Sequence, residues 1–163
     1  MLYVVMLGGR HPRAKIEVHD VVFVVADSLE TAYPQLRDAW FGNNEGLHID
    51  SWLEVGGIDN HRIEFSFHAP APGDLRLYFI NLGAYEEQIF GEAHRYLLVS
   101  ARDKTEAKTL GKQRMQTGWM KPHIDALLDV DDCLPIDQVN GHYLRLVEGP
   151  HRGIVQRSDY ILL

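Results

Sequence analysis

The chain has 163 residues, of which 45% are hydrophobic and 24% charged, and its formal net charge is −7. These values are usual for a soluble globular protein, and the negative charge disfavours nucleic acid as a partner because a phosphate backbone would be repelled. The first apolar run, residues 2–7, is too short for a membrane span or a secretory signal, and the single cysteine, Cys133, excludes an intrachain disulfide. We therefore expect a cytoplasmic protein that binds neither membrane nor nucleic acid.

The predicted elements alternate between strands and one helix in the first part of the chain. A continuous apolar run predicts a strand over residues 2–7, and a valine-rich segment predicts a second strand over 18–26. A helix is expected to begin after Ser28, whose hydroxyl can cap a free amide of the first turn. A third strand over 47–55 and a fourth over 61–67 flank a glycine-rich turn at 56–60, which predicts a hairpin.

An internal repeat is the strongest pattern in the sequence. A shift of 75 residues aligns positions 2–57 with 77–132, and fourteen of these 56 pairs are identical, where average residue usage would give about three or four. The extra residues of the second copy are placed at 133–140. The sequence therefore predicts two modules, 1–67 and 77–146, a proline-containing linker, 68–76, and a tail, 147–163, all packed as one compact unit. The end of the tail, residues 160–163, could add an edge strand or close the core.

Each predicted module is strand–strand–helix–strand–strand. We accordingly expect an α+β fold, in which the duplicated modules are related by a pseudo-two-fold axis and their helices pack on antiparallel or mixed sheet.

Several short motifs of the first module resemble one bacterial family. They are Leu7-Gly8-Gly9, Glu17-Val18-His19-Asp20, Tyr33-Pro34-Gln35-Leu36, Trp40-Phe41-Gly42 and Leu47-His48-Ile49-Asp50-Ser51-Trp52. These motifs are similar to the domain-of-unknown-function family numbered 1543, whose members look like one or two copies of this module. The resemblance implies the modular architecture and leaves the activity open.

Paired histidines and aspartates are the most informative polar residues. His48 and Asp50 are two apart in a predicted strand, so both project from one face, and His19 opens a neighbouring strand. The repeat gives a mirrored set, His94, His123 and Asp125. Histidine with carboxylate can bind a divalent metal ion, but the same residues can be structural, with an aspartate fixing the tautomer of a histidine.

A basic loop distinguishes the first copy from the second. Arg10, His11, Arg13 and Lys15 follow the first strand, whereas the second copy has acidic residues there. This loop is a candidate site for an anionic ligand, assisted by the amides of Gly8 and Gly9, or else a solvated surface loop.

Three functional hypotheses follow. The leading one is a non-catalytic module that needs no cofactor and binds an unknown small ligand or protein in the groove between the copies or at an exposed strand edge. The second is an enzyme that uses a divalent metal at the His/Asp sets. The third is a structural protein that forms a homodimer through its sheet edges.

Overall fold

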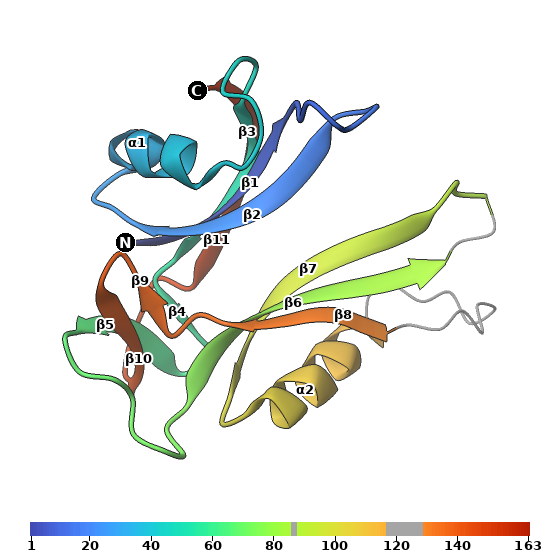
Figure 1. Cartoon of the computed structure of the whole chain (residues 1–163). Coiled ribbons are helices and arrows are strands. Elements are labelled where there is room, and N and C mark those ends of the chain that lie inside the picture. The colour runs from blue at the N-terminus through green and yellow to red at the C-terminus, as the bar shows by residue number, and fades with distance from the viewer. Residues whose placement is uncertain (86–87, 117–128) are drawn as a thin grey trace. The chain divides into compact units, whose positions relative to one another are not determined.

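The computed structural model describes residues 1–85, 88–116 and 129–163, which divide into two compact units (Figure 1). The first unit consists of Met1–Ile63, Val139–Gly141 and Val147–Leu163. The second consists of the described residues within Glu64–Gln138 and His142–Leu146. No helix in the described ranges is long and apolar enough to cross a membrane.

The first unit contains a four-stranded antiparallel sheet with the strand order β11-β3-β1-β2. Its strands are β1 (Leu2–Gly9), β2 (Val18–Val25), β3 (His48–Val55) and β11 (Ile154–Leu162). β1 is buried along most of its length because it lies between two other strands, whereas β11 is largely exposed at the edge. The tail thus supplies an edge strand, as predicted, and the first strand runs two residues further than predicted, through Gly8 and Gly9.

Helix α1 (Leu29–Ala39) contributes to the core of this unit. Its side chains Leu29, Ala32 and Leu36 are buried in one hydrophobic cluster with residues of β1 and β3. The predicted cap is confirmed: the hydroxyl of Ser28 accepts a hydrogen bond from the amide of Thr31, and the hydroxyl of Thr31 accepts one from the amide of Ser28. The apolar face of α1 therefore packs against the strands that carry the polar residues described below.

The second unit contains a three-stranded antiparallel sheet with the order β7-β6-β8. Its elements are β6 (Arg76–Tyr85), β7 (Glu92–Ala101), α2 (Lys104–Gln116) and β8 (Asp129–Pro135). The carboxylate of Asp103 caps α2 by accepting hydrogen bonds from the amides of Thr105 and Glu106. Ile80, Val99 and Ala107 lie in the core of this unit.

A further sheet has the strand order β4-β5-β10-β9. Its strands are β4 (Gly57–Ile58), β5 (His61–Ser66), β10 (His142–Glu148) and β9 (Gln138–Val139). Asp59 and Asn140 adopt left-handed φ angles of 53° and 51° in the tight turns, a conformation that aspartate and asparagine tolerate better than most residues.

The predicted α+β fold class was wrong, because the protein is mostly β, with 52% strand and 15% helix. The described residues form eleven strands but only two helices, of 11 and 13 residues. The module pattern accounts for eight of these strands. The other three are β4 and β9, which pair within segments expected to be turn or insertion, and β11 from the tail.

Candidate functional site

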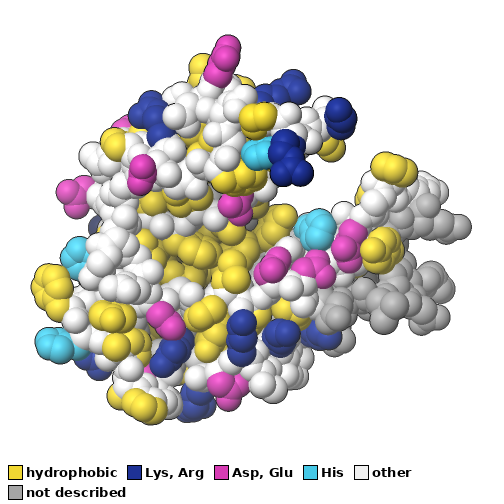
Figure 2. Space-filling view, viewed as in Figure 1, with side chains coloured by type: hydrophobic (Ala, Val, Ile, Leu, Met, Phe, Trp, Pro, Cys, Tyr) yellow, Lys and Arg dark blue, Asp and Glu magenta, His cyan; other side chains and the backbone are white. Residues whose placement is uncertain are grey.

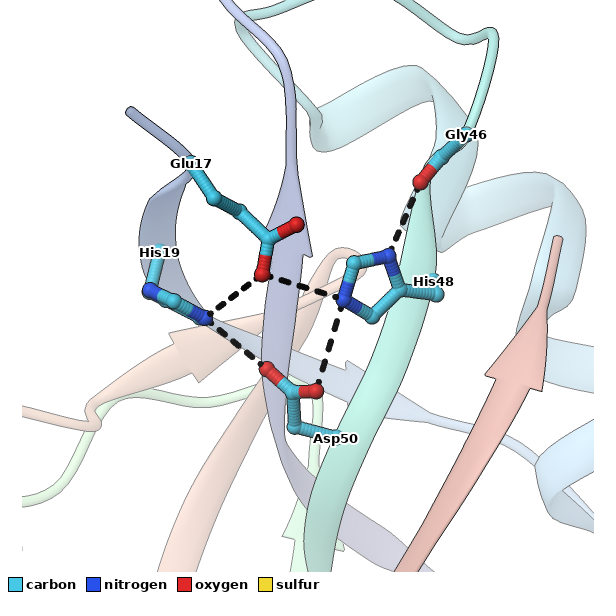
Figure 3. A network of polar contacts seen from close by, with 5 residues as sticks. All are labelled: Glu17, His19, Gly46, His48 and Asp50. Carbon is cyan, nitrogen blue, oxygen red and sulfur yellow. Dashed lines mark hydrogen bonds and ion pairs between the residues drawn. The ribbon is translucent and has the colours of Figure 1, made fainter. Parts of the chain in front are cut away.

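Four polar side chains meet on the sheet of the first unit (Figure 3). We call this group the first cluster, and its members are Glu17, His19, His48 and Asp50. The oxygen Oε1 of Glu17 lies 3.3 Å from Nε2 of His19 and 3.5 Å from Nε2 of His48. The two oxygens of Asp50 lie 3.2 Å and 3.4 Å from the same two nitrogens. Each carboxylate therefore spans both imidazoles.

The pairing of three strands brings these residues together. In the register of the sheet, Gly8 of β1 stands opposite His19 of β2 on one side and His48 of β3 on the other. A register shift between Met6 and Leu7 leaves Asp50 without a partner residue on β1, as in a β-bulge, a feature often found beside functional sites.

Gly8 provides the space beneath the first cluster. A Cβ atom at this position would lie 2.6 Å from Nε2 of His48 and 2.9 Å from Oδ2 of Asp50. Because atoms cannot approach so closely, any larger residue would displace the polar side chains. The need for glycine here is thus steric, and it comes from the cluster and not from a turn.

His48 is held in one orientation. Its side chain is only 3% exposed, and Nδ1 lies 2.8 Å from the carbonyl oxygen of Gly46. Since a carbonyl only accepts hydrogen bonds, this contact places the ring hydrogen on Nδ1. Nε2 then faces the two carboxylates, and the ring of Tyr160 lies 4.3 Å from the imidazole between centroids.

The other three side chains are open to solvent. His19 is 48% exposed, Glu17 42% and Asp50 34%. The first cluster thus has a rigid buried side at His48 and an accessible side at which water or a small solute can approach.

Hydrogen bonds alone do not explain the first cluster well. Charge-assisted N–H···O bonds are about 2.7–2.9 Å long, whereas the four nitrogen–oxygen distances run from 3.2 to 3.5 Å. With one hydrogen on Nδ1, His48 meets the two anionic oxygens through Nε2, which either carries a second hydrogen, as in an imidazolium, or offers its lone pair to a cation that lies between them. Two imidazole nitrogens and two carboxylates are donors that suit a divalent transition-metal ion.

The structure brings His19, His48 and Asp50 together, but their role stays a prediction. Glu17 was missed as a site residue. The signal that identifies it is its position two residues before His19, which places both side chains on one face of an extended segment.

The mirrored set differs from the expected one. His123 and Asp125 lie outside the described residues, and His94 is grouped with Glu92 and Asp131. Strand β8 pairs with β6 in the way that β3 pairs with β1. It begins at Asp129, which stands opposite Gly83. Residues 133–135, expected to be part of an insertion, belong to this strand.

The basic loop contacts the segment that follows α1, where the amide of Asn43 donates a hydrogen bond to the carbonyl oxygen of Arg10. Nδ1 of His11 accepts a hydrogen bond from the amide of Arg13, and the His11 ring lies 5.6 Å from Phe41. Arg10, Arg13 and Lys15 are exposed, while Gly8 and Gly9 lie within the β1–β2 pairing. Binding of an anion by this loop stays a prediction.

Comparisons with known proteins identify relatives without a stated activity. Residues 14–65 match the family described as Domain of Unknown Function (DUF1543), and this range includes all four residues of the first cluster. The chain is 33% identical to a protein Il1583 from Idiomarina loihiensis, whose crystal structure aligns over 99% of this chain and 97% of that chain with a TM-score of 0.74. No curated protein matches the chain.

Proposed function

Because the chain belongs to the family of Domain of Unknown Function DUF1543, whose description states no activity, we propose a function from the site itself: the protein binds a divalent transition-metal ion at the first cluster. The ligands are Glu17, His19, His48 and Asp50.

The orientation of His48 is the observation that carries this proposal. A buried imidazole with Nδ1–H on a backbone carbonyl and Nε2 aimed at a cluster of donors is the arrangement of a metal-ligating histidine and its outer hydrogen bond. The carbonyl of Gly46 fixes the tautomer, so that Nε2 can give its lone pair to a cation. The two carboxylates supply the negative charge that makes a cation favourable there.

The donor set favours zinc or a neighbouring first-row ion over magnesium or calcium. Two imidazole nitrogens suit zinc, iron, copper and nickel, whereas magnesium and calcium prefer oxygen donors alone. Zinc binds histidine and carboxylate at about 2.0–2.2 Å. The neighbouring donors of the first cluster lie 3.2–3.5 Å apart, and the side chains must draw together across the site before all four reach one ion at that distance.

The exposure of three ligands supports a second candidate function, a metal-dependent hydrolase. An accessible side leaves a coordination position for water, whose pKa a metal can lower to about 7. The test is a hydrolase substrate panel with zinc-, manganese- and iron-loaded protein. Turnover that disappears in Asp50→Asn supports an enzyme, and no turnover with any metal supports a binding protein.

Metal titration tests the proposed function directly. The full chain is treated with a chelator, freed of chelator and titrated with Zn²⁺ by calorimetry and with Co²⁺ by absorption spectroscopy. His19→Ala and Asp50→Asn should each bind one zinc ion per chain fewer than the wild type. His19 is exposed and Asp50 is half-buried, and Asp50→Asn keeps the size of the side chain, so these variants should keep the fold, which circular dichroism verifies.

Matched substitutions outside the first cluster serve as controls. His68→Ala and Asp38→Asn change exposed residues of the same types and should bind zinc like the wild type. A wild-type protein that binds no zinc, or cluster variants that bind as many ions as the controls, would show that the proposal is wrong.

The expected duplication, cytoplasmic location and homodimer stay predictions of ours. The duplication is supported by the order of elements, because strand–strand–helix–strand in the first unit is repeated as β6-β7-α2-β8 in the second. Light scattering tests the homodimer.

A further inference from the structure

We propose that the second unit holds a separate cation site, formed by Glu92, His94 and Asp131, which takes a hard divalent ion such as Mn²⁺ or Mg²⁺. We call these three residues the second cluster. One ligand atom from each lies within 4.8 Å of the other two, and Nδ1 of His94 lies 3.2 Å from Oδ2 of Asp131. This site lies in the other unit and does not depend on the first cluster.

The backbone places the second cluster in the same way as the first. Gly83 stands opposite His94 of β7 on one side and Asp129 of β8 on the other. A register shift between Asn81 and Leu82 leaves Asp131 without a partner on β6, as Asp50 is left on β3. A Cβ at Gly83 would collide with the carboxylates of Asp131 and Glu92. In both sheets, therefore, a glycine lies beneath a glutamate and a histidine spaced as Glu-x-His and beneath an aspartate at a β-bulge.

The donors of the second cluster differ in kind from those of the first. In the second unit, Asp129 occupies the register position that His48 has in the first unit, opposite the glycine. The second cluster therefore has no counterpart of His48, and its one histidine is His94. The side-chain oxygen of Asn81 lies 3.2 Å from Nδ1 of His94, and its amide nitrogen donates to Asp132 over 3.0 Å. Oxygen donors therefore surround a single imidazole.

An oxygen-rich, open site favours a hard ion. Magnesium and manganese prefer carboxylate, carbonyl and water ligands, and magnesium keeps several of its waters when bound. His94 and Asp131 are exposed and Glu92 is half-buried, so solvent can complete the shell. Acidic side chains gather beside a histidine over the strands of this unit (Figure 2), which adds to the attraction for a dication.

Manganese binding tests the second cluster after the first has been removed. The full-length His19→Ala/Asp50→Asn variant is freed of metal and titrated with Mn²⁺, and free Mn²⁺ is followed by electron paramagnetic resonance. We expect one bound ion per chain. Adding Asp131→Asn or Glu92→Gln should weaken this binding about tenfold or more, while adding Asp38→Asn, a carboxylate change in the other unit, should leave it unchanged.

The experiment separates this proposal from the proposed function. If His19→Ala/Asp50→Asn binds no Mn²⁺, or if Asp131→Asn binds it as tightly as Asp38→Asn, the second site does not exist. Magnesium competition tests the class of ion: excess Mg²⁺ should displace the bound Mn²⁺ from this variant, and Mn²⁺ that excess Mg²⁺ cannot displace would overturn the assignment of a hard ion. Zn²⁺ is not the competitor used, because it binds most sites of nitrogen and oxygen donors more tightly than Mn²⁺ does. Loss of zinc at the first cluster is measured separately and does not enter this result.

Discussion

Gly8 shows how one residue can determine whether the first cluster forms. Alanine at this position would place a Cβ 2.6 Å from Nε2 of His48, and the buried imidazole has no space into which to move. Gly8→Ala should therefore abolish zinc binding and lower the free energy of unfolding by about 1–3 kcal/mol, as measured by calorimetric titration and urea denaturation.

Gly83→Ala is the matched control for this change. It should spare zinc binding at the first cluster and abolish manganese binding at the second, since its Cβ would collide with Asp131 and Glu92. Unchanged zinc affinity in Gly8→Ala would contradict the close approach on which the site depends.

Cys133 is expected to be an unreactive thiol in the folded protein. Burial raises its pKa, and the nearby Lys104 and Lys108 only partly oppose this effect. Because the folded state keeps the thiol proton to higher pH than the unfolded chain, the stability that this provides is lost as pH rises through the raised pKa.

Alkylation by iodoacetamide measures this reactivity. At pH 8 the native protein should react much more slowly than the urea-unfolded chain, and the native rate should still be rising at a pH where the unfolded rate has reached its plateau. Equal rates in the two states would mean that the thiol is accessible.

Much of the first cluster could be predicted from the sequence, and part of the second could not. His48 and Asp50 were found because strand periodicity places them on one face, and His19 was found because it opens a neighbouring strand. Asp131 was missed because an alignment without gaps, at a shift of 75 residues, set Asp125 against Asp50. In the structure, Asp131 corresponds to Asp50 at a distance of 81 residues along the chain (131 − 50 = 81), whereas Gly83 corresponds to Gly8 at a distance of 75 (83 − 8 = 75). The second copy has thus gained six residues between these positions, and no local sequence pattern marks where.

At the scale of elements, the cap of α1 contributes to the stability of the first unit. Ser28→Ala removes the acceptor for the amide of Thr31 and should cost about 1 kcal/mol, while Ser28→Gly should cost only a few tenths. Urea denaturation followed by tryptophan fluorescence measures both. Zinc binding should be unaffected, since the cap is on the helix and not in the first cluster; equal stability of Ser28→Ala and wild type would contradict the capping role.

The strands and helix starts of the first unit were predictable because each has a local cause. An apolar run specifies β1, a valine-rich segment specifies β2, and Ser28 specifies the start of α1. The end of β1 was not predictable. Two glycines usually interrupt a strand, and here they continue it because the polar cluster and Trp40 fill the space that their side chains would occupy.

For the whole molecule, the prediction of the fold class missed three strands that leave only weak signals in the sequence. β4 and β9 have two residues each, and β11 is exposed over most of its length, so none of the three has the hydrophobic pattern of a core strand. With them, the described residues form eleven strands instead of the eight expected, against two helices. The chain as a whole is acidic, with a net charge of −7, which accords with the binding of cations and not of anions.

In the function proposed above, one metal ion is bound by Glu17, His19, His48 and Asp50. The most direct measurement is an anomalous difference map from crystals of the zinc-loaded full chain, collected on both sides of the zinc absorption edge. We predict a peak within about 2.0–2.2 Å of Nε2 of His48 and of an oxygen of Asp50. Zinc-loaded crystals with no anomalous peak among these four side chains would contradict the account.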